Sequence, residues 1–187
     1  MKEFIRENQL LSLCGLNCGL CPMFLGHYCG GCGNGNQSCK IAACSLRHGR
    51  VAYCYECECY PCENYWQIDE FDSFITHKRR KADLEKAKSG GVEAYNREQT
   101  EKIALLHWLL DHCNDGRRKT FFCVAVNLLE LPELQQAMAK IRTNQGWPAW
   151  PLKEKSVYVV DLLQTIAKKR NLELKLNKKK QKQKETG

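Results

Sequence analysis

Cysteines are crowded into one short part of this chain. All but two of its 13 cysteines lie between Cys14 and Cys62, and this segment has few apolar residues from which to build an ordinary core. A segment of about 50 residues without such a core usually needs metal ions or disulfides to fold. The cysteine pattern therefore constrains the fold more than any other feature of the sequence.

Four pairs of these cysteines are separated by two residues. A C-x-x-C pair in a tight turn can direct both sulfur atoms at one ion, and two pairs complete a tetrahedral zinc site with bonds of about 2.3 Å. Adjacent glycines permit the turn and let backbone amides point at the sulfurs. We therefore expect two zinc ions, with ligands drawn from Cys14, Cys18, Cys21, Cys29, Cys32, Cys39, Cys44, Cys54, Cys57 and Cys62.

The segment from Cys29 to Cys44 predicts a self-contained site. Cys29-Gly30-Gly31-Cys32 has the form of a zinc knuckle, and Cys39 and Cys44 complete the spacing C-x2-C-x6-C-x4-C. A short helix after Cys39 is expected to carry Cys44. These four thiolates could enclose one ion without a ligand from elsewhere in the chain.

The second predicted site joins the two ends of the cysteine-rich segment. Cys18 and Cys21 are expected to bind with two cysteines of the 54–62 group, while Cys14 and Cys62 could replace members of this set. The pairing stays open. His27 and His48 could also serve as ligands, although a surface or half-buried position is the simpler interpretation of each.

Disulfide bonds and buried free thiols could also account for some of the cysteines. A disulfide scaffold fits poorly, because the number of cysteines is odd and nothing marks an oxidising compartment. Cys113 and Cys123 fall on predicted helix faces and are expected to be buried free thiols.

An iron–sulfur cluster is a more serious alternative. The spacing Cys14-x3-Cys18-x2-Cys21 matches the one by which radical S-adenosylmethionine enzymes hold a [4Fe–4S] cluster. Those enzymes need a barrel of alternating strands and helices, and the sequence after Cys21 shows no such alternation. The cluster remains an alternative to zinc at these three cysteines.

Taken together, the motifs resemble a family of cysteine-rich prokaryotic proteins, a domain of unknown function expected to bind zinc. The resemblance covers about residues 12–66, and it rests on the opening Cys14-Gly15-Leu16-Asn17-Cys18-Gly19-Leu20-Cys21-Pro22 and the closing Pro61-Cys62. Cys59 stands where such proteins tend to have another residue, so it is not expected to be a ligand. The family implies no activity. The resemblance implies metal ligands at Cys14, Cys18, Cys21, Cys32, Cys39, Cys44, Cys54, Cys57 and Cys62.

Beyond Trp66, cysteines become rare and apolar residues follow helical spacing. In the first of these helical stretches, Trp66, Phe71, Phe74 and Ile75 are expected on the apolar side. The Trp147–Pro151 segment, with two prolines, is expected to be an extended loop. Helices are predicted over 63–88 (one or two helices), 92–113, 117–129, 132–143 and 153–169, and glycine-containing breaks follow the first two of these ranges.

The predicted fold class is mainly α. We expect three parts: a cysteine-rich, metal-stabilised module with zinc-knuckle turns over residues 1–66, a region of four to five helices packed on it over 67–170, and a disordered basic tail over 171–187. From Lys168 onward there are nine Lys or Arg and two Glu, so most of the formal charge of +8 belongs to the last 20 residues.

The basic tail allows a nucleic-acid partner, and Lys78-Arg79-Arg80-Lys81 adds further cations. A zinc-knuckle protein that binds nucleic acid is therefore an alternative function. The cysteine segment itself is nearly neutral, and its aromatic residues, Tyr53, Tyr55, Tyr60, Tyr65 and Trp66, are expected to cover the sulfur cluster instead. A solvated tail and a protein partner are the other possibilities.

Other classes of function are disfavoured. The longest apolar stretch, 103–110, is far shorter than the roughly 20 residues that span a bilayer, and residues 1–13 are not expected to form a signal peptide. We expect a cytosolic protein, where thiols stay reduced. P-loop, G-x-S-x-G and H-E-x-x-H motifs are absent. The expected role is a binding or regulatory module with structural zinc rather than an enzyme, and the question of catalytic activity stays open.

Overall fold

The computed structural model describes residues 4–34 and 39–179, and within these ranges it contains helices but no strand. The prediction of a mainly α fold is therefore confirmed. None of the helices in the described ranges is both long and apolar enough to cross a membrane. The helices are α1 (Pro22–Leu25), α2 (Lys40–Arg47), α3 (Arg80–Gly90), α4 (Val92–Cys113), α5 (Lys119–Leu128), α6 (Leu131–Thr143) and α7 (Leu152–Lys169).

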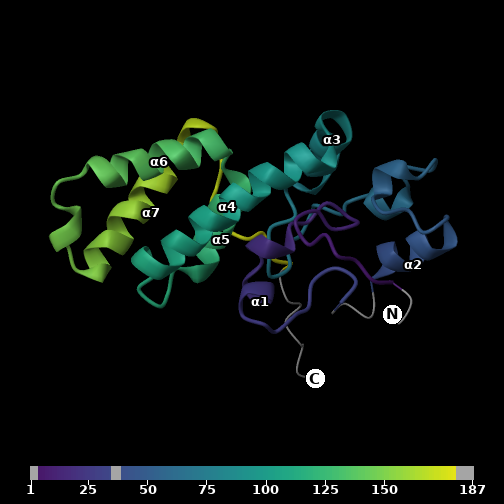
Figure 1. The fold of residues 1–187 in the computed structure, drawn as a ribbon, viewed down its shortest axis with the longest axis horizontal. Coiled ribbons are helices and arrows are strands. Elements are labelled where there is room, and N and C mark those ends of the chain that lie inside the picture. Colours follow the sequence, from purple (N-terminus) through teal and green to yellow (C-terminus); the bar gives the residue numbers. More distant parts are fainter. Residues whose placement is uncertain (1–3, 35–38, 180–187) are drawn as a thin grey trace, which may run out of the picture.

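Helices α4 to α7 form a bundle at one end of the molecule (Figure 1). Its core is built from apolar side chains that recur at helical spacing, among them Leu106, Leu109, Phe122, Val126 and Leu163. Helix α4 contacts α3 as well as the other three helices of the bundle. It therefore connects the bundle to the rest of the chain.

The cysteine-rich part lies at the other end, with α2 far from α6 and α7 (Figure 1). Its chain also makes tight 3-10 turns: η1 (Cys18–Leu20) before α1, and η2 (Cys54–Glu56) and η3 (Glu63–Tyr65) after α2. Two small cores stabilise it. Leu11 and Tyr65 pack against α3 and α4, while Leu13 packs with Phe4 and Ala42. Such small cores provide little stability on their own.

The helix predicted over 63–88 is wrong in its first half. Only η3 and α3 are helical there, and the chain between them is irregular. The carboxylate of Asp72 accepts a hydrogen bond from the amide of His77 at 2.6 Å, which offers the backbone an alternative to helical bonding. As a result Trp66 and Phe74 are 81% and 58% exposed, whereas Ile75 is buried as expected.

The chain after α7 folds back onto this irregular segment. The amide of Asp72 donates to the carbonyl of Asn177, and the amide of Asn177 donates to the Asp72 carboxylate, both at 2.7 Å. Lys179 Nζ lies 5.9 Å from the ring centre of Phe71. The described part of the predicted tail, residues 171–179, therefore contacts the segment between η3 and α3. The remainder of that predicted tail, 180–187, lies outside the described residues.

Candidate metal centre

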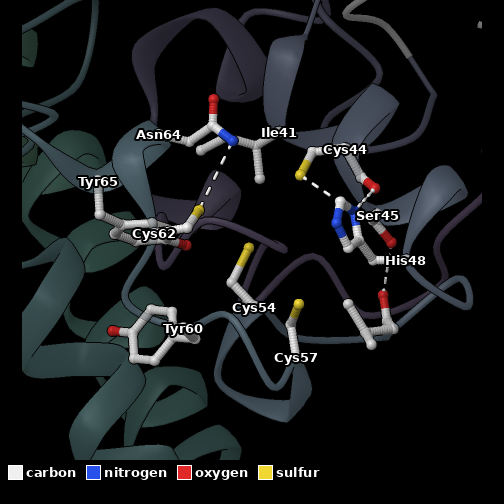
Figure 2. Close-up of a pocket in the computed structure, with 11 residues that line it drawn as sticks. Ile41, Cys44, Ser45, His48, Cys54, Cys57, Tyr60, Cys62, Asn64 and Tyr65 are labelled. Atoms are coloured by element: carbon white, nitrogen blue, oxygen red, sulfur yellow. Dashed lines mark hydrogen bonds between the residues drawn. The ribbon is translucent and has the colours of Figure 1, made fainter.

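Four cysteine side chains surround one small pocket (Figure 2). Cys44 comes from α2, Cys54 and Cys57 from η2 and its C-terminal end, and Cys62 from the start of η3. The cavity has a volume of about 20 Å³. A cavity of about 10–15 Å³ on this measure already holds a water-sized sphere. The cavity therefore has room for an object of about the size of one ion.

The backbone of η2 holds Cys54 and Cys57 on the same side of the chain. The carboxylate of Glu56 accepts hydrogen bonds from the amides of Ala52 and Tyr53, at 2.8 and 3.0 Å. The amide of Cys57 donates to the carbonyl of Cys54 at 3.1 Å. This closed turn is the geometry by which a C-x-x-C pair directs two sulfurs at one ion.

Polar side chains approach two of the four sulfurs. The Nδ2 of Asn64 donates to the Cys62 sulfur at 3.6 Å. The Nδ1 of His48 lies 3.5 Å from the Cys44 sulfur and 3.0 Å from the carbonyl oxygen of the same residue. Donors of this kind are typical of the surroundings of thiolate ligands, because they stabilise the negative charge on sulfur.

The third sulfur, that of Cys54, faces Tyr65. The Tyr65 hydroxyl is buried and makes no hydrogen bond of full geometry within the described residues, but it lies in hydrogen-bonding reach of Cys54. Burial raises the pKa of the Cys54 thiol to about 12, while the Tyr65 hydroxyl lowers it by a smaller amount. A buried thiol of this kind ionises readily only when a cation is bound beside it.

A second group of sulfurs lies outside this pocket. The thiols of Cys14, Cys18 and Cys32 are close enough to one another for their charges to interact. Burial raises the pKa of Cys18 to about 12 and that of Cys32 to about 11, and backbone amides partly oppose the shift. The hydroxyl of Ser12 lies 3.4 Å from the Cys14 sulfur. Three neighbouring thiols, one buried and two half-buried, again have the chemistry of a soft-metal site.

Two further predicted ligands, Cys21 and Cys39, lie at the edges of this second group. Cys21 is in electrostatic range of Cys18, and Cys39 is in range of Cys32. The Cys29 sulfur accepts a hydrogen bond from the amide of Gly31 at 3.4 Å, as expected of a knuckle turn.

The structure groups the cysteines differently from the predicted pairing. Cys39 is the N-cap of α2 and Cys44 lies five residues later. Five residues correspond to about 140° around a helix axis, since each residue turns by about 100°. The two sulfurs therefore leave α2 in different directions. Cys44 joins the 54–62 group, while Cys32 faces Cys18 and Cys14.

The remaining predicted candidates have other positions. Cys59 is exposed, and Cys113 and Cys123 are buried in the bundle core as expected. His48 lines the pocket, whereas His27 is exposed on another turn. No group of three or more His, Cys, Asp or Glu side chains within 4–34 and 39–179 already has the spacing of a metal site. Side-chain rotations would therefore be needed before these thiols could enclose an ion.

Asn64 and Tyr65 were not identified as functional residues from the sequence, beyond the expectation that tyrosines cover the sulfurs. Tyr60 and Tyr65 do line the pocket, with their rings edge to face at 4.9 Å, whereas Trp66 points to solvent. The sequence signal that could have identified Asn64 and Tyr65 is their position, two and three residues after the candidate ligand Cys62.

Comparison with protein-family models, with curated proteins and with solved structures gives no match to this chain. The functional assignment of the pocket therefore rests on its own chemistry.

Proposed function

We propose that the protein binds a zinc ion through Cys44, Cys54, Cys57 and Cys62, and that this ion stabilises a binding or regulatory module. The observation that carries the proposal is the meeting of four sulfurs around one ion-sized cavity. Zinc prefers four such ligands in tetrahedral array. The ion would cross-link α2, η2 and η3, which are otherwise joined by two small cores.

A second ion belongs to the same proposal. Cys14, Cys18 and Cys32 would supply three ligands, and Cys21 or Cys39 the fourth. The iron–sulfur enzyme alternative is less well supported. It needs a barrel of strands and helices around Cys14, Cys18 and Cys21, and the described ranges contain no strand.

The proposed ions have a structural role. A zinc ion enclosed by four thiolates has no open position for a substrate or for an activated water. Its contribution is folding free energy, because the unfolded chain cannot hold the ligands together. The functional surface is therefore expected on the outside of the module that the ions stabilise.

The test is metal analysis of protein purified in air. Two zinc ions per chain are expected, and Cys44→Ser and Cys18→Ser should each remove one of them. Cys113→Ser is the matched control, since Cys113 is buried in the bundle core and away from both sulfur groups. A brown protein that contains iron and sulfide would rule out zinc.

A second candidate function is the binding of single-stranded nucleic acid. Two aromatic rings, Trp66 and Phe74, are 81% and 58% exposed on the segment to which the basic tail is attached. Exposed rings stack on bases, and lysines such as Lys178 and Lys179 neutralise phosphates. The presence of exposed aromatic rings beside these lysines is the observation that favours a nucleic-acid partner over a merely solvated tail.

Titration with a fluorescent single-stranded RNA tests this second function. Trp66→Ala should weaken binding at least several-fold, since base stacking on one ring contributes about 1–3 kcal/mol. Tyr28→Ala is the control, because Tyr28 is an equally exposed ring (78%) outside that segment. Absence of binding at low salt would exclude nucleic acid as the partner.

A further inference from the structure

Hydrogen-bond donors are distributed unevenly around the pocket. Cys62 is approached by the amide of Asn64, and Cys54 by the hydroxyl of Tyr65. The Cys57 sulfur is different. Within the described residues its polar contact is the thiol of Cys59, a weak donor, and no nitrogen or hydroxyl group donates to it. Figure 2 shows its sulfur at the side of the pocket opposite Asn64 and Tyr65.

The Tyr65 hydroxyl is the clearest sign of a missing partner. The side chain is only 3% exposed, and its ring is held by Tyr60 and by the small core with Leu11 and Leu84. A buried hydroxyl without a full hydrogen bond is destabilising, and such groups are rare in folded proteins. A thiolate at Cys54 is a much stronger acceptor than a thiol, so ionisation of Cys54 on metal binding would complete this bond.

Asn64 is fixed in a similar way. It lies in η3, whose N-cap is Cys62 itself, and the amide of Tyr65 donates to the carbonyl of Cys62 at 2.9 Å. The η3 turn therefore begins at the proposed ligand Cys62, and it directs the side chains of Asn64 and Tyr65 toward the pocket. The backbone of this turn sets the positions of both donors.

We propose that Tyr65 and Asn64 are positioning residues that donate hydrogen bonds to the metal-bound thiolates of Cys54 and Cys62, and that Cys57 is the ligand most reactive toward electrophiles. This inference rests on the proposed zinc site. A hydrogen bond draws electron density from the sulfur lone pairs and so lowers their nucleophilicity. Cys57 lacks such a bond and keeps its lone pairs available.

Alkylation with iodoacetamide tests the order of reactivity. In this reaction a sulfur lone pair attacks the methylene carbon, a carbon–sulfur bond forms and iodide leaves. The zinc-loaded protein should carry Cys59→Ala, because the exposed Cys59 thiol would otherwise react first. Peptide mapping should then find Cys57 modified before the other three ligands. Earlier modification of Cys54 or Cys62 would overturn the proposal.

Two variants then give position-specific results. Tyr65→Phe should raise the alkylation rate at Cys54, and Asn64→Leu the rate at Cys62, each by roughly three- to tenfold, as expected for loss of one charge-assisted hydrogen bond. Tyr60→Phe is the matched control. Tyr60 lines the same pocket, but Figure 2 shows its hydroxyl pointing away from the sulfurs, so no rate should change.

Cobalt(II) supplies a spectroscopic measurement that a general loss of stability would not mimic. Loss of a hydrogen bond raises the energy of the sulfur lone pairs, so the thiolate-to-cobalt charge-transfer band should move to longer wavelength in Tyr65→Phe and Asn64→Leu, but not in Tyr60→Phe. If one variant fails to bind metal, the other still tests the proposal, Tyr65→Phe at Cys54 or Asn64→Leu at Cys62. Normal metal content with unchanged bands and rates would refute the donor roles, whereas absence of bound metal in the parent would refute the zinc site itself.

Discussion

The side-chain amide of Asn17 donates a hydrogen bond of 3.0 Å to Oε1 of Gln99 on α4. Asn17 lies between Cys14 and Cys18, and its Oδ1 accepts the amide of Gly19 at 2.9 Å. Both side chains of the pair are buried. The turn that carries two candidate ligands is therefore attached to the bundle by an enclosed amide pair, which couples the second sulfur group to α4.

Replacement of Gln99 by Leu should destabilise the protein by about 1–3 kcal/mol, because the Asn17 amide would be left buried without an acceptor. Urea unfolding of the metal-loaded protein measures this. Gln135→Leu is the control, since Gln135 makes a similar bond to Glu101 at 3.1 Å on the exposed surface and should change stability by less than about 0.5 kcal/mol. Equal effects at the two positions would contradict the coupling.

Gly15 is expected to tolerate no side chain. Its φ of +91° disfavours other residues, and a Cβ there would lie 2.3 Å from the carbonyl oxygen of Arg80 at the start of α3. Gly15→Ala should therefore cost about 2–5 kcal/mol, from left-handed strain and overpacking together.

Gly116→Ala separates the backbone strain from the overpacking when the stabilities of both alanine variants are measured by thermal or urea unfolding. Gly116 has nearly the same φ, +88°, but no atom lies within 4 Å of its Cβ position. Only the backbone strain of about 1–2 kcal/mol should remain. If the two alanine variants are equally stable, the Cys14–Cys18 turn does not pack closely on α3.

Much of the bundle could be predicted because its helices are marked by local signals. The prediction over 92–113 coincides with α4, whose ends follow Gly91 and precede Asn114. The failure came between Trp66 and Arg80, where aromatic spacing resembles a helical face. Hydrogen bonds between Asp72 and the distant Asn177 hold that segment in another conformation, and local periodicity contains no information about such contacts.

The candidate site was predictable in composition but not in pairing. Spacing identifies which cysteines can bind metal, and it also suggested a short helix that carries Cys44, which is α2. It does not specify the direction in which a sulfur leaves that helix. Cys44 could be assigned to Cys54, Cys57 and Cys62 only after the fold brought α2 beside η2 and η3.

The buried Lys102 predicts a pH dependence of stability. Burial lowers its pKa from the ordinary 10.5 to about 8, and the positive charge of Arg79 adds to this, while Asp83 and Glu130 oppose it. Between these two pKa values the unfolded chain binds more protons than the folded one, so this group makes stability rise with pH. The gain attributable to Lys102 from about pH 7.5 to 9.5 should be roughly 2 kcal/mol.

Other groups titrate in the same range, so the comparison is with Lys102→Met. The stability of the wild type relative to this variant should increase as pH rises, because the contributions of all other groups are shared. Urea unfolding of both proteins at matched pH values measures the difference. A constant or falling difference would mean that Lys102 stays fully charged, paired with Asp83, across this range.

Trp66 should report metal binding in the cysteine-rich module. It follows Cys62 by four residues, so its Cα lies within about 15 Å of that ligand. Trp108, Trp147 and Trp150 belong instead to an aromatic group in the bundle, where the rings of Trp108 and Trp147 are stacked at 6.1 Å.

Cobalt(II) bound at the pocket quenches the nearest indole most strongly. Titration of the apo protein with cobalt should therefore reduce fluorescence, and Trp66→Phe should remove most of that change. Trp150→Phe, the matched control, should lower the total intensity while the quenching persists. Quenching that survives in Trp66→Phe would place the metal elsewhere.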